Sequence, residues 1–184
     1  MKKIDPLEHV YSFQTERLSI QSWSLLSSNS SGEYSFAEKI VKILTPSATK
    51  YLPDNWQCIS NVEEAETWIQ NRLNEAKLLT VKLLSSGEIS GIVILHELAL
   101  QEGENIDIHL GYILGESFWG KGLGNEVVNG FIQYCISLNY INSIIAGVAK
   151  SNIPSIKILE KNGFQLQNSV NLSKTETFMK YSIQ

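Results

Sequence analysis

Hydrophobic and polar residues alternate in several short runs, and these runs predict strands. The first run covers residues 16–23. The next two, residues 79–84 and 88–98, are separated by Ser85-Ser86-Gly87, which predicts an antiparallel hairpin. The remaining strands are expected over residues 106–114, 143–149, 164–170 and 175–183.

Elsewhere apolar residues recur every three or four positions, which predicts helices. A short helix is expected over residues 36–44, stopped by Pro46. A clearer helix starts at Ser60 and Glu63, which form a capping-box pair, and another covers residues 121–138. The apolar stripes of these last two helices are Val62, Ala65, Ile69, Leu73 and Ala76, and then Leu123, Val127, Phe131, Cys135 and Leu138.

The order of these elements predicts the fold class. A last helix is expected over residues 153–162, ended by Gly163. The helical crossover between the strands at 106–114 and 143–149 requires locally parallel pairing inside a mainly antiparallel sheet. We therefore predict one mixed α/β (α+β) domain over residues 1–184, with about seven strands and four or five helices. Serine-rich residues 22–35 and acidic residues 102–104 are expected to form loops.

Composition excludes several other classes of protein. A net charge of −4 argues against a protein that coats nucleic-acid phosphates. Two lysines near the start have no apolar stretch behind them, and polar residues interrupt every apolar run, so neither a signal peptide nor a membrane span is expected. Cys58 and Cys135 are too few for a disulfide framework, and Cys135 is expected to be an inert buried thiol. We expect a cytoplasmic protein.

Three alternating glycines between a strand and a helix are the main candidate for chemistry. They lie in Trp119-Gly120-Lys121-Gly122-Leu123-Gly124. Glycine lets the backbone turn tightly and brings amide N–H groups close to an anion, and a helix start adds unpaired donors and a favourable dipole. A diphosphate would fit this loop, with Lys121 contributing charge; the alternative is a tight turn without a ligand.

Two other phosphate-binding motifs fit less well. Residues 115–121 read G-x-x-x-x-G-K, but Gly122 follows where a nucleotide-triphosphate loop needs Ser or Thr for magnesium. A dinucleotide fingerprint needs G-x-G-x-x-G after the first strand of a βαβ unit, and neither the spacing nor the preceding hairpin fits.

The sequence resembles the GNAT superfamily of N-acetyltransferases, in particular its Rim-type ribosomal-protein N-terminal acetyltransferases. The resemblance extends over nearly the whole chain, beginning at Thr15-Glu16-Arg17-Leu18. Further matching stretches follow in the same order and spacing: Leu110-Gly111-Tyr112-Ile113-Leu114, residues 118–126, Asn152-Ile153-Pro154-Ser155 and residues 159–164.

This resemblance implies a splayed sheet that binds acetyl-CoA as co-substrate, without a metal. The pantetheine arm would lie between the strands at 106–114 and 143–149 and bond the backbone of the first. Amides of the glycine loop would bind the pyrophosphate, and Asn152 and Ser155 would line the thioester end. The coenzyme site expected from the resemblance is Tyr112, Ile113, Leu114, Trp119, Gly120, Lys121, Gly122, Leu123, Gly124, Asn125, Asn152 and Ser155.

Three positions depart from the general pattern of the superfamily. Many members begin the loop with Gln or Arg. This chain has Trp119 at that position, and in this it resembles the Rim-type branch. Leu159 occupies the position of a tyrosine that serves as the acid for the departing thiolate in many members. His109 replaces a glutamate two residues before the strand glycine.

Acetyl transfer to an amine needs a neutral nitrogen and a place for the charge of the thiolate. Deprotonating an α-amino group near pKa 8 costs only about 1 kcal/mol at neutral pH, whereas a lysine near 10.4 costs roughly 4–5 kcal/mol. Candidates for the base are His109 and Asp107, two apart on one strand, with Glu97 as a third. Ser155 could protonate the sulfur. The alternative roles are structural: a strand histidine in packing, and a helix-start hydroxyl bonded to backbone.

The expected function is direct transfer of acetyl from acetyl-CoA to a primary amine, with a protein N-terminal α-amino group favoured. Polyamines, amino acids and aminoglycosides are alternative acceptors, and a CoA-binding sensor with little turnover is an alternative of a different class. Tyr51, Trp56 and Trp68 could belong to the acceptor wall or to buried packing.

Overall fold

The computed structural model describes residues 10–23, 36–99, 105–167 and 175–183. Eight strands form one sheet in the order β1-β2-β3-β4-β5-β6-β8-β7. Neighbouring strands are antiparallel except β5 and β6, which are parallel as the helical crossover requires. The strands are β1 Ser12–Gln14, β2 Leu18–Ser22, β3 Lys77–Leu83, β4 Ile89–Ala99, β5 Ile106–Leu114, β6 Ile141–Ala149, β7 Gln165–Leu166 and β8 Glu176–Ser182.

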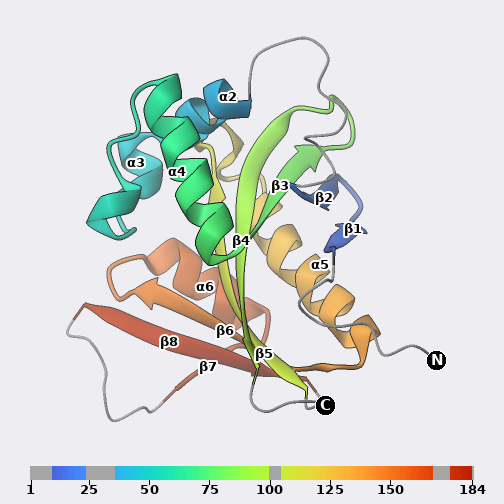
Figure 1. The fold of residues 1–184 in the computed structure, drawn as a ribbon. Coiled ribbons are helices and arrows are strands. Elements are labelled where there is room, and N and C mark those ends of the chain that lie inside the picture. Colours follow the sequence, from blue (N-terminus) through green and yellow to red (C-terminus); the bar gives the residue numbers. More distant parts are fainter. Residues whose placement is uncertain (1–9, 24–35, 100–104, 168–174, 184) are drawn as a thin grey trace.

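Helices cover both faces of the sheet (Figure 1). The four predicted helices are confirmed, and a short helix between the first two was missed. Pro46 does not merely end a helix: it starts this extra one, capped by Thr45, whose Oγ1 accepts a hydrogen bond from the Ala48 amide at 3.3 Å. The helices are α2 Phe36–Ile43, α3 Pro46–Thr49, α4 Val62–Glu75, α5 Leu123–Leu138 and α6 Ile153–Lys161, with 3-10 turns η2 Asp54–Trp56 and η3 Glu116–Phe118.

The start of the sheet differs from the prediction. The expected first strand, residues 16–23, is shorter and begins at Leu18 because residues 15–17 form the turn from an additional strand, β1. The Thr15 amide donates to the Leu18 carbonyl at 2.9 Å across this turn. A strand of three residues is too short to show a pattern of alternation, so the sequence did not reveal it.

The cap of α4 is also displaced by one residue. Asn61 is the N-cap, and its side chain accepts from the Glu64 amide at 2.9 Å. Ser60 instead donates from its hydroxyl and its amide to the Glu64 carboxylate, so the predicted Ser60–Glu63 pair is wrong. The last strand before β8 was predicted over residues 164–170; β7 covers Gln165–Leu166, and residues 168–170 lie outside the described residues. Residues 24–35 and 102–104, expected as loops, also lie outside them.

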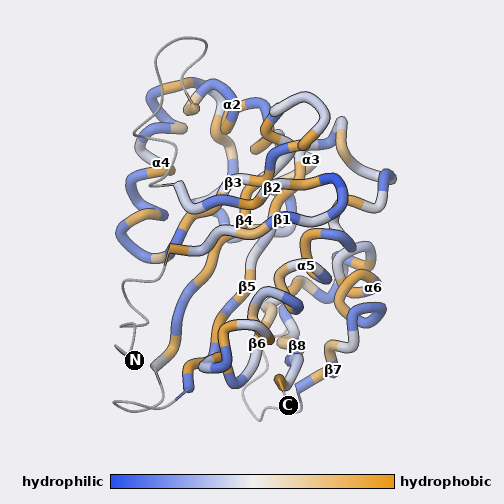
Figure 2. Tube along the Cα trace, turned by 90° about the vertical axis from the view of Figure 1, so that its right-hand side faces the viewer, coloured by the Kyte–Doolittle hydropathy of each residue, from blue (hydrophilic) through white to orange (hydrophobic). Residues whose placement is uncertain are grey.

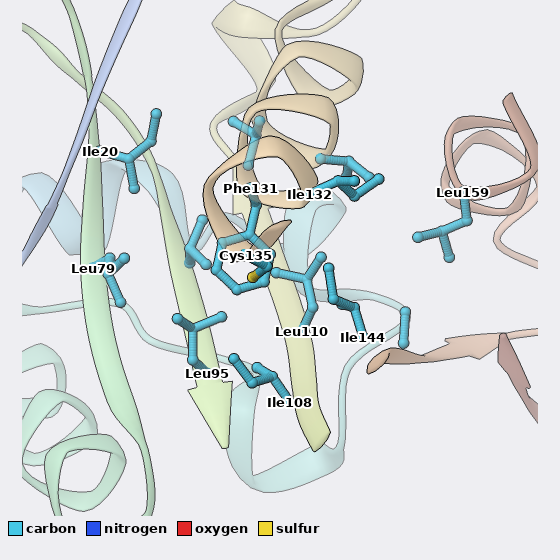
Figure 3. Packing of buried hydrophobic residues seen from close by; sticks show 14 of the residues in the cluster. Ile20, Leu79, Leu95, Ile108, Leu110, Phe131, Ile132, Cys135, Ile144 and Leu159 are labelled. Atoms are coloured by element: carbon cyan, nitrogen blue, oxygen red, sulfur yellow. The ribbon is translucent and has the colours of Figure 1, made fainter. Parts of the chain in front are cut away.

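Two hydrophobic clusters pack against opposite faces of the sheet. On one face α5 places Phe131, Ile132 and the buried Cys135 over Ile108 and Leu110 of β5 (Figure 3). On the other face α2 and α4 pack over Ile92, Ile94 and Ile113. In Figure 2 the outer turns of α4 are largely hydrophilic, as expected for a helix with one face buried. Successive residues of β5 therefore belong to different cores.

The parallel strands at the centre of the sheet diverge. β5 pairs with β4 from Ile106 to Leu114, but with β6 only from Ile106 to His109, where His109 faces Ile145. Beyond this point the β6-facing edge of β5 has no ladder partner in the described sheet. This confirms the splayed pair that the resemblance implied. It leaves the backbone groups on the β6-facing edge of residues 110–114 without a strand partner, although the Leu114 carbonyl accepts from Trp119.

Candidate coenzyme and acetyl-transfer site

A cavity of about 530 Å³ lies beside the diverging strands. The end of β5, the glycine loop before α5, the start of α6 and the α3 region form its wall. The residues that line it are Ser47, Ala48, Lys50, Tyr51, Leu52, Tyr112, Ile113, Leu114, Phe118, Trp119, Gly120, Gly122, Leu123, Gly124, Asn125, Asn152, Pro154, Ser155 and Ile158. Apart from Lys121, every residue of the predicted coenzyme site lines this cavity.

The glycine loop has the backbone conformation of an anion site. Gly120 and Gly122 have φ values of 72° and 77°, in the left-handed region that favours glycine. Gly122 is the N-cap of α5 and provides no side chain to cap the first amides. The first N–H groups of a helix have no acceptor within the helix, and the helix dipole adds partial positive charge there. The arrangement can therefore receive a phosphate group at the cavity wall.

Trp119 fastens the beginning of this loop to the strand. Its indole Nε1 donates to the Leu114 carbonyl at 2.8 Å, while the ring remains half exposed. Lys121 is directed elsewhere: its Nζ lies 5.6 Å from the centre of the Phe118 ring. Trp119 thus has a structural role that was not evident from its position at the Gln or Arg that begins this loop in many members of the superfamily.

Two hydroxyl groups meet in the cavity. The Tyr112 hydroxyl donates to Ser155 Oγ at 3.4 Å, across two elements that are 43 residues apart. Burial raises the pKa of Tyr112, and the hydrogen bond with Ser155 offsets only part of this effect. The phenol therefore remains a proton donor at neutral pH.

Asn152 and Asn162 position the start and end of α6. The Asn152 side chain caps the helix by accepting from the Ser155 amide at 3.3 Å. Asn162 Nδ2 donates to Asn125 Oδ1 at 3.1 Å and so ties the end of α6 to the first turn of α5. Leu159, at the position of the family's tyrosine, is buried among core residues, as Figure 3 shows, and Ile158 lines the cavity instead.

The candidate bases Asp107 and His109 do not line the cavity. Both lie on the face of β5 opposite Tyr112, because neighbouring strand residues alternate between faces. Asp107 is buried and engaged with β6: it accepts from Asn142 Nδ2 at 2.8 Å and from Ser143 Oγ at 2.5 Å, and its carboxylate lies 3.8 Å from Lys180 Nζ. These contacts join the two strands just before they diverge.

His109 is the last residue of β5 that pairs with β6, so it lies at the apex of the opening. Its ring packs at 6.5 Å from His96 and 6.3 Å from Phe178, measured between ring centres. Burial lowers the pKa of His109, the charge of His96 lowers it further, and Asp107 opposes both effects. The imidazole is therefore neutral at pH 7 and able to accept a proton.

Glu97, the third candidate base, accepts a hydrogen bond of 2.5 Å from the Tyr11 hydroxyl. Burial raises the pKa of Tyr11, and the bond to Glu97 reinforces the shift. Glu97 does not line the cavity, and its carboxylate is engaged by Tyr11 instead.

The aromatic residues proposed for an acceptor wall separate into two groups. Tyr51 lines the cavity. Trp56 and Trp68 pack edge to face with ring centres 5.9 Å apart, and Arg72 of α4 stacks 4.3 Å from the centre of the Trp56 ring. The two tryptophans belong to the packing of α4 rather than to the cavity wall.

Residues of α3 and of the segment that follows it were missed by the sequence analysis. Ser47, Ala48, Lys50 and Leu52 line the cavity, and the Thr45 hydroxyl donates to the Glu116 carboxylate beside the glycine loop. The signal for this helix was the pair Thr45-Pro46, a cap followed by proline at the first helical position. Among the described residues no group of three His, Cys, Asp or Glu side chains could hold a metal, and no helix is long and apolar enough to cross a bilayer.

Comparison with known proteins agrees with this geometry. The sequence model of the acetyltransferase (GNAT) domain matches residues 35–165. An N-acetyltransferase of Bacillus licheniformis named p20, described as uncharacterized, is 32% identical over 125 residues, which are 65% of this chain and 67% of the relative.

Solved structures show the same fold at low sequence identity. A GNAT-family acetyltransferase from Bacillus anthracis superimposes with a TM-score of 0.72 at 18% identity, over 94% of this chain and 98% of that one. RimL, a ribosomal L7/L12 α-N-protein acetyltransferase solved with coenzyme A, has a TM-score of 0.68 at 15% identity, over 92% and 96% of the two chains.

The chain belongs to the GNAT acetyltransferase family. It is an acetyltransferase that acts with acetyl-CoA, the donor that this family uses.

Proposed function

We propose that this enzyme moves acetyl directly from acetyl-CoA to an uncharged primary amine, with a protein N-terminal α-amino group as the preferred acceptor. The observation that carries the proposal is the cavity at the divergence of β5 and β6, where a strand edge and an uncapped helix start lie side by side.

The coenzyme would lie on the α5 face of the sheet. Its pyrophosphate would accept from the amides of Gly120 to Asn125, and its pantetheine amides would pair with the backbone of Tyr112, Ile113 and Leu114. Asn152 and Ser155 would be next to the thioester. Lys121, whose side chain packs on Phe118, would contribute through its backbone rather than through its charge.

The amine would arrive from the opposite face, through the opening above His109. His109 lies at the apex of that opening and is neutral at pH 7, so it is the favoured proton acceptor on this side. Asp107 would hold the two strands and the histidine in place rather than take the proton, because Asn142 and Ser143 donate to its carboxylate.

The departing thiolate needs a proton donor, and the hydroxyl pair of Tyr112 and Ser155 is placed to provide it. The proton passes from Ser155 to the sulfur as the C–S bond breaks, and Tyr112 donates to Ser155 in turn. This pair would take the role of the tyrosine that Leu159 replaces.

The preference for an α-amino group follows from proton energetics. Such a group is neutral at a cost of about 1 kcal/mol at pH 7, whereas a lysine costs roughly 4–5 kcal/mol, and a half-buried histidine is a modest base. The α-N-protein acetyltransferase activity named for the structural neighbour RimL is consistent with this preference.

The test is an acceptor panel with acetyl-CoA and detection of free thiol. Peptides with a free N-terminus are expected to be turned over faster than the same peptides with a blocked N-terminus and a free lysine. A polyamine, a free amino acid and an aminoglycoside complete the panel. Preference for one of these, with peptides inactive, would contradict the proposed acceptor but not the acetyl-CoA chemistry.

A further inference from the structure

The turn between β1 and β2 is bonded to the glycine loop by a cluster of contacts that the proposed chemistry does not use. Three donors of this turn converge on the carboxylate of Glu126, in the first turn of α5. Thr15 Oγ1 donates at 2.6 Å, the Arg17 amide at 2.8 Å and Arg17 Nε at 2.6 Å. The contacts join residues more than 100 positions apart in the sequence, so the fold, not the local chain, brings them together.

The same guanidinium also reaches the loop backbone. Arg17 Nη1 donates to the Lys121 carbonyl at 3.0 Å, and Nη2 lies 3.6 Å from the point where a Cβ on Gly122 would be. In a trans peptide the carbonyl and the N–H point in opposite directions. The Gly122 N–H is therefore directed away from Arg17. Gly122 lies between two hollows: one that Arg17 and Glu126 also line, and the coenzyme cavity, which neither of them lines. The side away from Arg17 is therefore the side of the cavity.

The Lys121–Gly122 peptide plane can rotate through ψ of Lys121 and φ of Gly122, because Gly122 tolerates either sign of φ. A rotated plane would present a carbonyl oxygen to the diphosphate instead of an N–H. The bond from Arg17 removes this freedom by holding the carbonyl on the outer side.

Charge provides a second reason for the contact. Glu126 would be a negative group beside the binding site of an anion. Burial by itself would raise the pKa of Glu126, but the hydrogen bonds from Thr15 and Arg17 and the charge of Arg17 outweigh it, so the group stays ionised. The guanidinium, 2.6 Å from Glu126 Oε2, offsets this charge.

We propose that Arg17 is a positioning residue for the donor: it orients the Lys121–Gly122 peptide toward the coenzyme diphosphate and neutralises Glu126 beside it. The inference rests on the proposed coenzyme site and extends it to a residue that does not line the cavity. It assigns a role to the Thr15–Arg17 turn, which otherwise only connects the edge strand β1 to its neighbour β2.

The experiment compares two donors that differ in the diphosphate. Acetyl-CoA contains it, and S-acetylpantetheine lacks both the diphosphate and the nucleotide. Replacement Arg17→Ala is expected to weaken binding of CoA, measured by calorimetry, and to raise the KM for acetyl-CoA by about tenfold, equivalent to ~1.4 kcal/mol. The kcat/KM for S-acetylpantetheine is expected to stay within about twofold of wild type.

Two further variants separate the effects of charge and geometry. Arg17→Lys keeps the charge, but a lysine ammonium cannot bond the Glu126 carboxylate and the Lys121 carbonyl together as the planar guanidinium does. Its affinity for CoA is expected to lie between those of wild type and Arg17→Ala. The double variant Arg17→Ala/Glu126→Gln removes the uncompensated carboxylate and is expected to bind CoA more tightly than Arg17→Ala. Melting temperatures of all variants identify any that fail to fold.

Each outcome supports or overturns one statement. Equal loss with both donors in a folded Arg17→Ala protein would show a general structural role and overturn the inference, as would unchanged CoA affinity. A double variant no tighter than Arg17→Ala would overturn the charge compensation. Wild-type protein that binds no CoA would instead overturn the proposed coenzyme site, which keeps the two failures distinguishable.

Discussion

The two faces of the opening between β5 and β6 differ in the kind of group that they present, backbone groups on one and side chains on the other. On the α5 face the proposed coenzyme contacts are largely backbone groups, supplied by Gly120, Gly122 and the free edge of β5. On the other face the proposed acceptor side consists of side chains, chiefly His109, whose ring packs near His96 and Phe178. Backbone donors at a helix start recognise any diphosphate, whereas side chains can be exchanged without disturbing the fold. The comparison explains how a family can keep one donor while it varies the acceptor.

The largest effect is expected from backbone strain in the glycine loop. Gly120→Val places a β-branched residue at φ 72°, which costs about 1–3 kcal/mol if the loop keeps its conformation and displaces the amides if it does not. We expect affinity for CoA to fall by roughly ten- to a hundredfold in calorimetry.

Gly87→Val is the matched control for this substitution. Gly87 has φ 71° in the β3–β4 turn, and a Cβ at either glycine meets no atom within 4 Å. The two variants should lose similar stability, but only Gly120→Val should lose CoA affinity. Equal affinity in both would show that the loop does not bind the coenzyme.

A smaller effect is expected on the same face from Tyr112→Phe, which removes the hydroxyl that donates to Ser155. We expect kcat to fall by about tenfold, at the low end of what proton transfer contributes because Ser155 remains, with CoA affinity nearly unchanged. Tyr181→Phe is the control, since its ring packs on Phe164 outside the cavity. A change in affinity without a change in kcat would assign Tyr112 to binding rather than to proton transfer.

The smallest effect is expected on the acceptor face, from His109→Gln. Protonation of the amine below about pH 8 lowers kcat/KM equally in wild type and variant. Because burial and His96 hold the pKa of His109 below 6.5, the ratio of wild-type to variant kcat/KM should stay constant from pH 8 to about 6.5 and fall at lower pH. Above pH 6.5 the variant should have a kcat/KM a few-fold below that of wild type, and the difference should shrink as His109 becomes protonated. His96→Gln removes one cause of the lowered pKa of His109, so the loss of rate caused by protonation of His109 should occur at higher pH. If neither variant changes the pH dependence of kcat/KM, His109 is not the base.

The same shift predicts a dependence of stability on pH. A histidine with a lowered pKa in the folded state binds a proton less readily there than in the unfolded chain. The contribution of His109 to the free energy of unfolding is therefore present above about pH 6.5. It is lost as the pH falls from the pKa of the unfolded state through that of the folded state. Urea unfolding of wild type and His109→Gln across this range would show converging stabilities at acidic pH.

Much of the fold was accessible from the sequence, but not at its edges. The central strands and α5 have long periodic patterns, and their predicted bounds agree with the structure within about two residues. β1 and α3 were missed because three or four residues carry too little periodicity, and both depend on contacts with distant elements. α3 mattered for the site, since it supplies part of the cavity wall.

The sequence by itself indicated where a tight glycine turn leads into an apolar helix, because glycine adopts the positive φ found at residues 120 and 122 at little cost and such preferences act within a few residues. The tertiary structure alone decided which side chains meet, including Tyr112 with Ser155, Asp107 with Ser143, and Arg17 with Glu126. Such pairs depend on strand order and register, which arise from packing of the whole chain and are not encoded at any one position.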